Sequence, residues 1–284
     1  MRIARTRLNR SLGGDLTLFL FLLAVACFMS LPLVYTISNA FKPLNELFLF
    51  PPRFLVRNPT LDNFRDLFIM LRSSWVPFTR YVYNSLVIAL LGTGGHVLFA
   101  SMAAYALSQF RFPGSRQFFN IVVFSLMFAP QVTTIPNYLI MARLKWVDSY
   151  LALIVPAWGM SLGLYLMKQF MDQIPKALLE SARIDGASEW RIFWQIVMPT
   201  VRPAWLTLII LSFQQLWGQT GGRFLFSERL KPIPYALQQI SSGGIARAGV
   251  AAAVGLIMML VPVTVFLINQ SNVVETMSTS GIRE

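Results

Sequence analysis

Residues 180–186 read Glu-Ser-Ala-Arg-Ile-Asp-Gly, and after a gap of nine residues positions 196–199 read Ile-Val-Met-Pro. The first of these stretches predicts a short helix over 176–184, because those residues are good helix formers and Pro175 suits a first helical turn. A glycine costs about 1 kcal/mol relative to alanine inside a helix. Gly186 is therefore expected either to end this helix or to use its missing side chain in a contact.

One side of the predicted helix is small and apolar. Leu179, Ala182 and Gly186 fall at positions i, i+3 and i+7 and share a face. Small residues let another helix or protein approach closely, so we expect this face to be open to a partner. The alternative is an amphipathic helix that lies on the membrane surface and binds anionic lipid through its arginines.

The rest of the chain has the composition of a membrane protein. Of its 284 residues 55% are hydrophobic and 13% are charged, whereas an average soluble domain is about 25% charged. A helix that crosses a bilayer needs about 20 mostly apolar residues. Six mainly apolar blocks approach or exceed that length and predict six spans. They cover residues 16–40, 83–107, 118–141, 150–171, 203–219 and 249–268.

The orientation of the spans depends on the first one. Counted for an N-terminus inside the cell, the 24 lysines and arginines divide equally between the two sides. The first span usually dominates, and its N-terminal flank is basic before Asp15. Its apolar stretch is also longer than the ~7–15 residues of a cleavable signal peptide, so we expect a retained span. Cytoplasmic N- and C-termini follow for a chain with six spans.

We predict three segments along the chain. A cytoplasmic N-terminal segment covers 1–15, a transmembrane domain with six spans covers 16–270, and a cytoplasmic tail covers 271–284. Within the domain, 172–202 is the charged cytoplasmic segment and 41–80 is an ordered extracellular cap or docking loop. Prolines in that loop block continuous helix and strand. They are Pro51, Pro52, Pro59 and Pro77.

The stretch at 180–199 resembles the cytoplasmic coupling motif of ABC importer permeases. That motif is Glu-Ala-Ala, three residues, Gly, nine residues, Ile, one residue and Leu-Pro, and the spacing here matches without a gap. Ser181 replaces alanine and Met198 replaces leucine. A pattern of seven fixed positions rarely arises by chance, which favours coupling over the surface helix. The resemblance implies contact with a separate ATPase subunit through Glu180, Ser181, Ala182, Asp185, Gly186, Ile196 and Pro199.

Other segments resemble the carbohydrate-uptake class, and within it the shorter permease of maltose-type systems. The class has the type I ABC importer permease fold, an all-α polytopic membrane protein with six transmembrane helices and a cytoplasmic coupling helix between the fourth and fifth. Thr276 stands where the family usually has glycine, and Trp217-Gly218-Gln219 stands where it has aromatic-Asn-Asp. The matching positions are 84–86, 103–107, 110–114, Pro130, Ile135, Pro136, Tyr138, Pro156, Pro262, Phe266, Gln270, Glu275 and Arg283.

Polar residues inside the apolar blocks are candidates for a sugar path. Amides in hydrocarbon are costly unless they face a partner helix or water, so they should point inward. They either bond sugar hydroxyls, with Trp217 offering its ring face, or join neighbouring helices. We also expect Pro130 and Pro136 to break the third span. The substrate-path candidates are Gln131, Asn137, Trp158, Tyr165, Gln214, Gln215, Trp217 and Gln219.

Small residues recur four apart at the start of the last span. Ala248 pairs with Ala252 and Gly249 with Ala253 in the small-xxx-small pattern. This pattern predicts close packing against a partner helix.

The chain carries no sign of its own energy source. It has no Gly-x-x-x-x-Gly-Lys-Ser/Thr loop and no Gly-Lys pair at all, so it lacks that phosphate cradle. We therefore expect no enzyme activity, no catalytic residue and no cofactor on this chain, with ATP and magnesium on partner subunits. His96 and Cys27 each stand alone and are interpreted as structural rather than as metal ligands.

The resemblance implies a set of partners in the bacterial inner membrane. They are a second homologous permease, two copies of an ABC ATPase subunit, an extracellular solute-binding protein, a saccharide substrate and membrane lipid. The net charge of +12 is not accompanied by a nucleic-acid-binding motif, so no nucleic acid is expected. The alternatives from other classes are an ion-coupled secondary carrier or channel, and a membrane scaffold.

The predicted outer surface is basic. Such charge attracts either an acidic oligosaccharide or an acidic binding protein, and we favour the binding protein. The residues are Arg53, Arg57, Arg72, Arg223, Arg229 and Lys231.

Overall fold

The computed structural model describes residues 12–73, 76–129, 131–244 and 247–280. Within these ranges all regular structure is helical, as predicted. The chain divides into two compact units. Unit 1 comprises Met1–Met70 with Ile240–Ile257, and unit 2 comprises Leu71–Gln239 with Met258–Glu284.

In unit 1, α1 (Leu12–Phe41) is the predicted first span. Its side chains are apolar and exposed along most of its length. The following loop is ordered by two buried charged residues. Lys42 Nζ donates to Asn39 Oδ1 at 2.7 Å and to the Arg53 carbonyl at 2.5 Å. The Glu46 carboxylate, in the short helix α2 (Leu44–Leu47), accepts the backbone N–H groups of Arg57 and Asn58, both at 3.1 Å.

The predicted loop also contains a helix that the prolines did not indicate. α3 (Asp62–Ser73) begins after Thr60, whose Oγ1 accepts the Asp62 N–H at 3.1 Å. Asn63 on α3 donates from Nδ2 to the carbonyls of Ala40 and Lys42, at and just after the end of α1, at 2.9 Å and 2.7 Å. Gly249 leaves the space for the Asn63 side chain, because a Cβ there would overlap it. The helix that packs against Gly249 is therefore α3 of the same chain.

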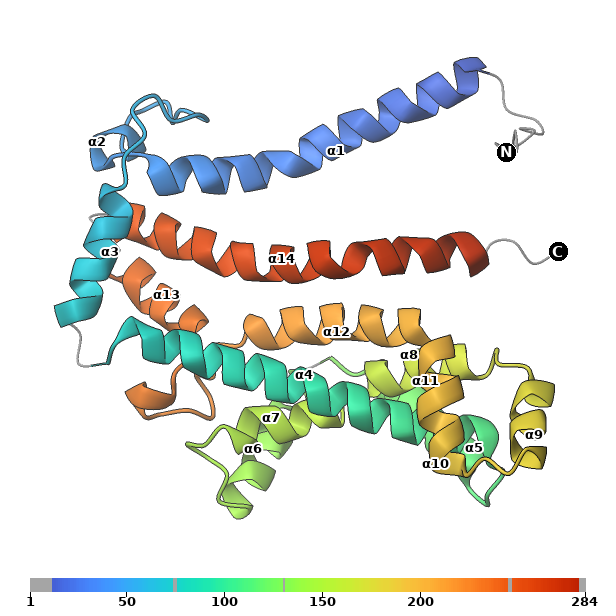
Figure 1. The fold of residues 1–284 in the computed structure, drawn as a ribbon. Helices are drawn as coiled ribbons and strands as arrows, with labels where there is room; N and C mark the ends of the chain where they lie inside the picture. Colours follow the sequence, from blue (N-terminus) through green and yellow to red (C-terminus); the bar gives the residue numbers. More distant parts are fainter. Residues whose placement is uncertain (1–11, 74–75, 130, 245–246, 281–284) are drawn as a thin grey trace. The chain divides into compact units, whose positions relative to one another are not determined.

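Unit 2 is built around α4 (Phe78–Gln109), which packs along α7 (Leu151–Trp158), α8 (Ser161–Met171) and α12 (Arg202–Trp217) (Figure 1). α4 matches the predicted second span. α7 and α8 together match the predicted fourth span, with a break at Gly159 and Met160.

The third apolar block forms two short helices. α5 (Ser115–Ser125) ends well before α6 (Thr134–Arg143) begins. Each helix is shorter than the ~20 residues that cross a bilayer, so a third span over 118–141 stays a prediction. The expected break is present, and Pro136 lies in the first turn of α6, where a missing N–H costs no helical bond. Pro130 lies outside the described residues.

The helix of the predicted fifth span, α12, meets the end of the preceding charged segment at a sharp bend. α10 (Glu189–Ile192), the π-helical turn η1 (Phe193–Val197) and α11 (Met198–Thr200) run into one another. A 77° bend then leads into α12. Pro199 lacks an N–H and its ring would collide with the carbonyl four residues earlier, and a wider π-helical turn relieves that conflict. Pro203 lies in the first turn of α12, where proline is accepted.

Three further helices complete the described chain. They are η2 (Glu228–Leu230), α13 (Ile233–Ser242) and α14 (Ala248–Ser280). Among the described residues four helices are long and apolar enough to cross a membrane, or five if the bent pair counts as one. The six-span count therefore stays a prediction.

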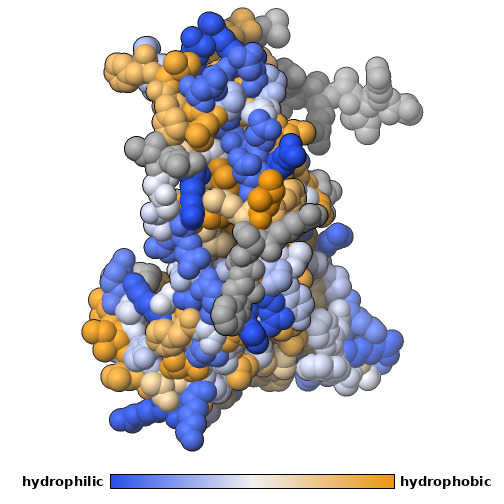
Figure 2. All heavy atoms as spheres, turned by 90° about the vertical axis from the view of Figure 1, so that its left-hand side faces the viewer, coloured by the Kyte–Doolittle hydropathy of each residue, from blue (hydrophilic) through white to orange (hydrophobic). Residues whose placement is uncertain are grey.

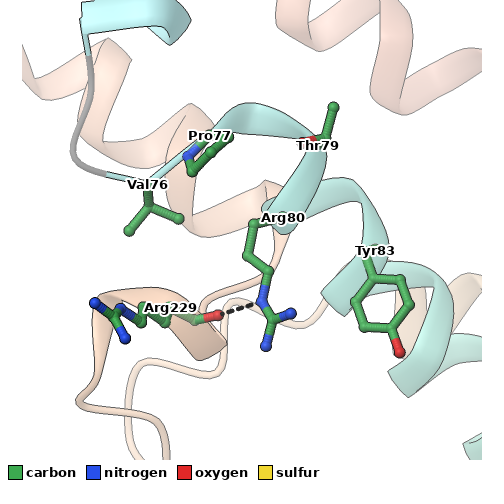
Figure 3. Close-up of a pocket in the computed structure, with 6 residues that line it drawn as sticks. All are labelled: Val76, Pro77, Thr79, Arg80, Tyr83 and Arg229. Atoms are coloured by element: carbon green, nitrogen blue, oxygen red, sulfur yellow. Dashed lines mark hydrogen bonds between the residues drawn. The ribbon is translucent and has the colours of Figure 1, made fainter.

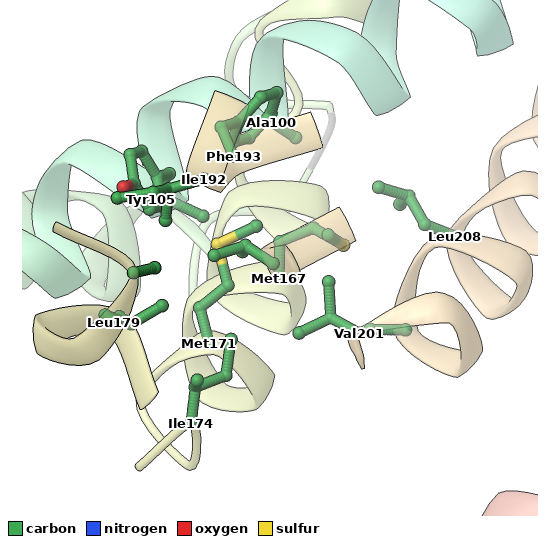
Figure 4. Packing of buried hydrophobic residues seen from close by; sticks show 14 residues of the cluster. Ala100, Tyr105, Met167, Met171, Ile174, Leu179, Ile192, Phe193, Val201 and Leu208 are labelled. Carbon is green, nitrogen blue, oxygen red and sulfur yellow. The ribbon is translucent and has the colours of Figure 1, made fainter. Parts of the chain in front are cut away.

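The core of unit 2 lies at the end where α4 finishes. Ala104 and Tyr105 from α4, Met167 and Met171 from α8 and Phe193 from η1 pack together there (Figure 4). Side chains from the segment after α8 join the same cluster. This core fastens the 172–202 segment to the spans.

Candidate coupling site and substrate path

The predicted coupling helix is present over its predicted residues as α9 (Lys176–Ile184). Pro175 precedes the helix as its N-cap rather than lying in its first turn. Gly186 has a φ of +80° with no atom near the position of a Cβ, so it ends the helix. The N–H groups of Gly186 and Ala187 donate to the carbonyls of Arg183 and Ala182, both at 3.0 Å. These two bonds form the Schellman motif, which requires a left-handed residue.

The small apolar face of α9 is turned inward. Leu179 is 0% exposed and Ala182 is 8% exposed, and both belong to the core of unit 2. The prediction that this face is open to a partner is therefore wrong for these two residues. The pattern marked a buried face correctly, but the chain's own helices cover it.

The opposite face of α9 is exposed. It presents Glu180 and Ser181, and the turn after the helix leaves Asp185 and Gly186 exposed as well. Ile184, the last residue of the helix, is 87% exposed. Of the two later candidates, Pro199 is exposed and Ile196 is half-buried; neither lies on α9. The coupling role of all these residues stays a prediction.

A charged contact joins this segment to α4. Tyr105, near the end of α4, donates its hydroxyl to Glu189 Oε2 at 2.5 Å. Arg183 donates from Nε to Glu189 Oε1 at 2.7 Å. Its bond to the Glu189 carboxylate raises the pKa of the Arg183 guanidinium above its usual value. α9 is thus held to the spans by polar contacts as well as by packing.

Sequence reasoning missed Glu189 in this contact. The residue before it, Ser188, accepts the N–H of Arg191 at 3.3 Å and caps α10. A serine followed by an acidic residue at a helix start was the available signal. No sequence signal indicated that Glu189 pairs with Tyr105, which lies 84 residues earlier.

His96 joins three helical segments inside unit 2. It is 1% exposed, its Nδ1 lies 3.0 Å from Ser212 Oγ on α12, and its Nε2 lies 3.1 Å from the Met160 carbonyl at the α7–α8 break. A carbonyl only accepts, so Nε2 carries the proton and Nδ1 accepts from the Ser212 hydroxyl. Gly163 leaves room for the ring, since a Cβ there would overlap it. The structural interpretation of this histidine is confirmed.

Replacing His96 by leucine is expected to destabilise the subunit by about 2–6 kcal/mol, because it leaves the buried Ser212 hydroxyl and the partly buried Met160 carbonyl unpaired at about 1–3 kcal/mol each. Thermal unfolding of the purified subunit in detergent measures this. The matched control is Thr93→Val, one turn earlier on α4, whose buried hydroxyl already has no partner in the described structure. That variant should unfold at or above the wild-type temperature. Equal melting temperatures for both variants would contradict this role of His96.

Two tryptophans among the substrate-path candidates pack within the chain. Trp158 donates from Nε1 to the Leu91 carbonyl at 3.0 Å, and its ring lies 5.2 Å from that of Phe99. Trp217 is 3% exposed, donates to the Met258 carbonyl at 3.1 Å and stacks on Phe213. Its ring face is therefore not available to a sugar in this structure. The helix-contact alternative fits both residues.

The remaining candidates keep polar groups near the surface of the chain. Gln214, Gln215 and Gln219, at the end of α12 and just after it, are exposed, as are Gln131 and Asn137 before and within α6. Tyr165 is half-buried and stacks on Phe119 at 6.2 Å between ring centres. No hydrogen bond joins the amides of the two groups in the described part of the chain. Their role in a substrate path stays a prediction.

Comparison with known proteins places this arrangement in a family. Residues 96–278 match the binding-protein-dependent transport system inner membrane component family. The chain is 30% identical to the galactooligosaccharides transport system permease protein GanQ of Bacillus subtilis, over 93% of this chain and 94% of that protein. It is 33% identical to the arabinooligosaccharides transport system permease protein AraQ of Halalkalibacterium halodurans, over 70% of each.

A solved structure shows the same fold. A chain of a bacterial ABC transporter involved in the import of the acidic polysaccharide alginate superposes with a TM-score of 0.77. The two chains are 19% identical, and the match covers 93% of this chain and 99% of that one. The family match extends over most of the chain, including α9 and α12. The chain is a membrane protein with the fold of an ABC importer permease, and it belongs to the binding-protein-dependent transport system inner membrane component family.

Proposed function

We propose that this chain is one of two permease subunits in an ATP-driven importer of oligosaccharides. Support for the cargo comes from GanQ and AraQ, which are named for galactooligosaccharides and arabinooligosaccharides. ATP would be hydrolysed by two separate ATPase subunits with magnesium, and a solute-binding protein would deliver the sugar. The N- and C-termini and α9 would lie in the cytoplasm.

The observation that carries the proposal is the two-sided character of α9. Its outer face is exposed and ends in Ile184, an apolar side chain that water surrounds in the isolated chain. Its inner face is anchored through Leu179 and Ala182 in the core that also holds α4, α8 and α12. A helix attached in this way moves with the spans rather than independently of them, because close-packed interiors transmit displacement.

The proposed mechanism follows from that attachment. Two ATPase subunits that close on ATP would push or rotate α9 from its outer face. The core and the Arg183–Glu189–Tyr105 contact would pass the displacement to α4 and α12. The spans would then open the sugar path towards the binding protein. Exposed amides on α12 and α6 would offer bonds to sugar hydroxyls along the way.

The test is ATPase stimulation in the assembled complex. The chain is reconstituted with its genomically neighbouring permease, ATPase and binding protein, and the binding protein is loaded in turn from a panel of neutral and acidic oligosaccharides. Stimulation by one class of sugar is expected and names the cargo. An assembled complex that no oligosaccharide stimulates would contradict the carbohydrate assignment.

A further inference from the structure

A basic cavity lies beside the first turns of α4. It has a volume of about 790 Å³. Figure 2 looks onto the side from which α4 starts and shows many hydrophilic side chains on that face. In Figure 3 the Arg80 side chain extends from α4 towards the loop that contains η2. The cavity is lined by Val76, Pro77, Thr79, Arg80, Tyr83 and Arg229.

The loop that forms one wall is held in place through its backbone. Asn84 Nδ2 donates to the carbonyls of Arg229 and Lys231, at 2.9 Å and 2.8 Å. Ser85 Oγ accepts the N–H of Ile233 at 2.8 Å. Arg80 Nε donates to the Arg229 carbonyl at 3.1 Å. The cavity is therefore shaped before any ligand arrives.

The acidic residues near the cavity already have partners. Glu228 accepts the Tyr81 hydroxyl at 2.5 Å. Asp148 accepts the hydroxyl and N–H of Ser227 and the N–H of Phe226, and these bonds hold the pKa of its carboxyl below the usual value. Both carboxylates are used to fix the loop.

The two arginines of the cavity lack such partners. No carboxylate pairs with Arg80 or Arg229 in the part of the chain that the structure describes, and both side chains are exposed. Beyond its bond to the Arg229 carbonyl, Arg80 has an outer nitrogen 3.5 Å from the Tyr150 hydroxyl, and its guanidinium lies over the Tyr83 ring. Donors of both guanidinium groups remain free, in the fork geometry that binds carboxylates.

We propose that this cavity receives a carboxylate side chain of the solute-binding protein, an inference that rests on the proposed function. α4 has 32 residues, so its two ends lie about 48 Å apart at 1.5 Å per residue. The coupling segment packs at the other end, which places the cavity on the outer surface if α9 is cytoplasmic. Its lining favours a protein partner, because arginine and tyrosine are enriched at interface hot spots and Val76 and Pro77 add apolar contacts beside them.

The test exploits the fact that Arg229 shapes the loop through its backbone carbonyl. Arg229→Gln removes the charge and leaves that carbonyl in place. The matched control, Arg223→Gln, removes the same charge from the same loop at a side chain that bonds Thr134 and does not line the cavity. Each variant complex is assembled in nanodiscs, and the Kd of the binding protein is measured with and without saturating sugar, at two salt concentrations.

Arg229→Gln is expected to raise the Kd at least tenfold, both with sugar and without it, and to reduce its dependence on salt. Arg223→Gln is expected to change the Kd less than twofold, because charges outside the contact are screened within about 8 Å at physiological salt. An unchanged Kd for Arg229→Gln would overturn the proposal. An effect confined to the sugar-loaded protein would also overturn it and assign the carboxylate to the cargo. A wild-type complex whose ATPase the loaded protein fails to stimulate would instead contradict the proposed function.

Discussion

Gly186→Val is expected to reduce uptake to background while the subunit still inserts in the membrane. Gly186 holds a left-handed φ of +80° in the turn that closes α9. A left-handed conformation costs an L-residue about 1–2 kcal/mol, and a β-branched residue is a true outlier there. The last turn of α9 should therefore unwind and displace Ile184 and Asp185 from the proposed contact. Uptake and membrane abundance are measured in the same cells.

Two companion variants separate this effect from backbone strain in general. Gly114→Val introduces the same residue at a φ of +87°, again with open space around the Cβ position, in the turn between α4 and α5. It should keep most of the uptake. Gly186→Asn should keep uptake within a few-fold of wild type, because asparagine visits the left-handed region readily. Normal uptake by Gly186→Val would refute the role assigned to the end of α9.

Ile184→Glu is expected to release the ATPase subunit from the complex. Ile184 is the most exposed large apolar residue of α9 and makes little contact with its own chain, so a charge there should leave the subunit folded. Loss of an apolar anchor at the centre of an interface costs at least about 2 kcal/mol, or roughly thirtyfold in affinity. Co-purification of the ATPase with the tagged permease measures the loss.

Two control variants test whether the loss of the ATPase comes from the exposed face of α9. Ile184→Leu should bind the ATPase as the wild type does. Leu179→Ala, on the buried face of the same helix, should lower the melting temperature of the subunit, because large-to-small changes in a core cost about 2–5 kcal/mol. If the Ile184→Glu complex retained all of its ATPase, the ATPase would not be bound through Ile184, which would contradict the role proposed for this end of α9.

The bounds of α9 could be predicted from the sequence because local chemistry sets them. Good helix formers fill the helix, proline precedes it and a glycine ends it. The family pattern could be recognised for the same reason, since its spacing lies within twenty residues; the coupling role that it implies stays a prediction. What covers the apolar face could not be predicted. Periodicity identifies a face, but the cluster that contains Leu179 also includes α4 side chains more than seventy residues earlier in the chain.

The other misses have the same origin. The prolines of the third apolar block predicted a break there, but hydropathy over 118–141 did not give the bounds of the two helices on either side of it. Trp217 has both a ring face and an N–H, and only the tertiary structure shows that Phe213 and Met258 take them. His96 was identified as structural, but its partners lie 64 and 116 residues away.

Uptake of labelled oligosaccharide into proteoliposomes tests the central claim most directly. The chain is reconstituted alone, and also with its partner permease and ATPase, and ATP, binding protein and an ion gradient are supplied separately. We expect uptake only in proteoliposomes that contain the full complex. These should take up sugar only when both ATP and the loaded binding protein are present. Uptake by the isolated chain under an ion gradient without ATP would contradict the account and identify a secondary carrier.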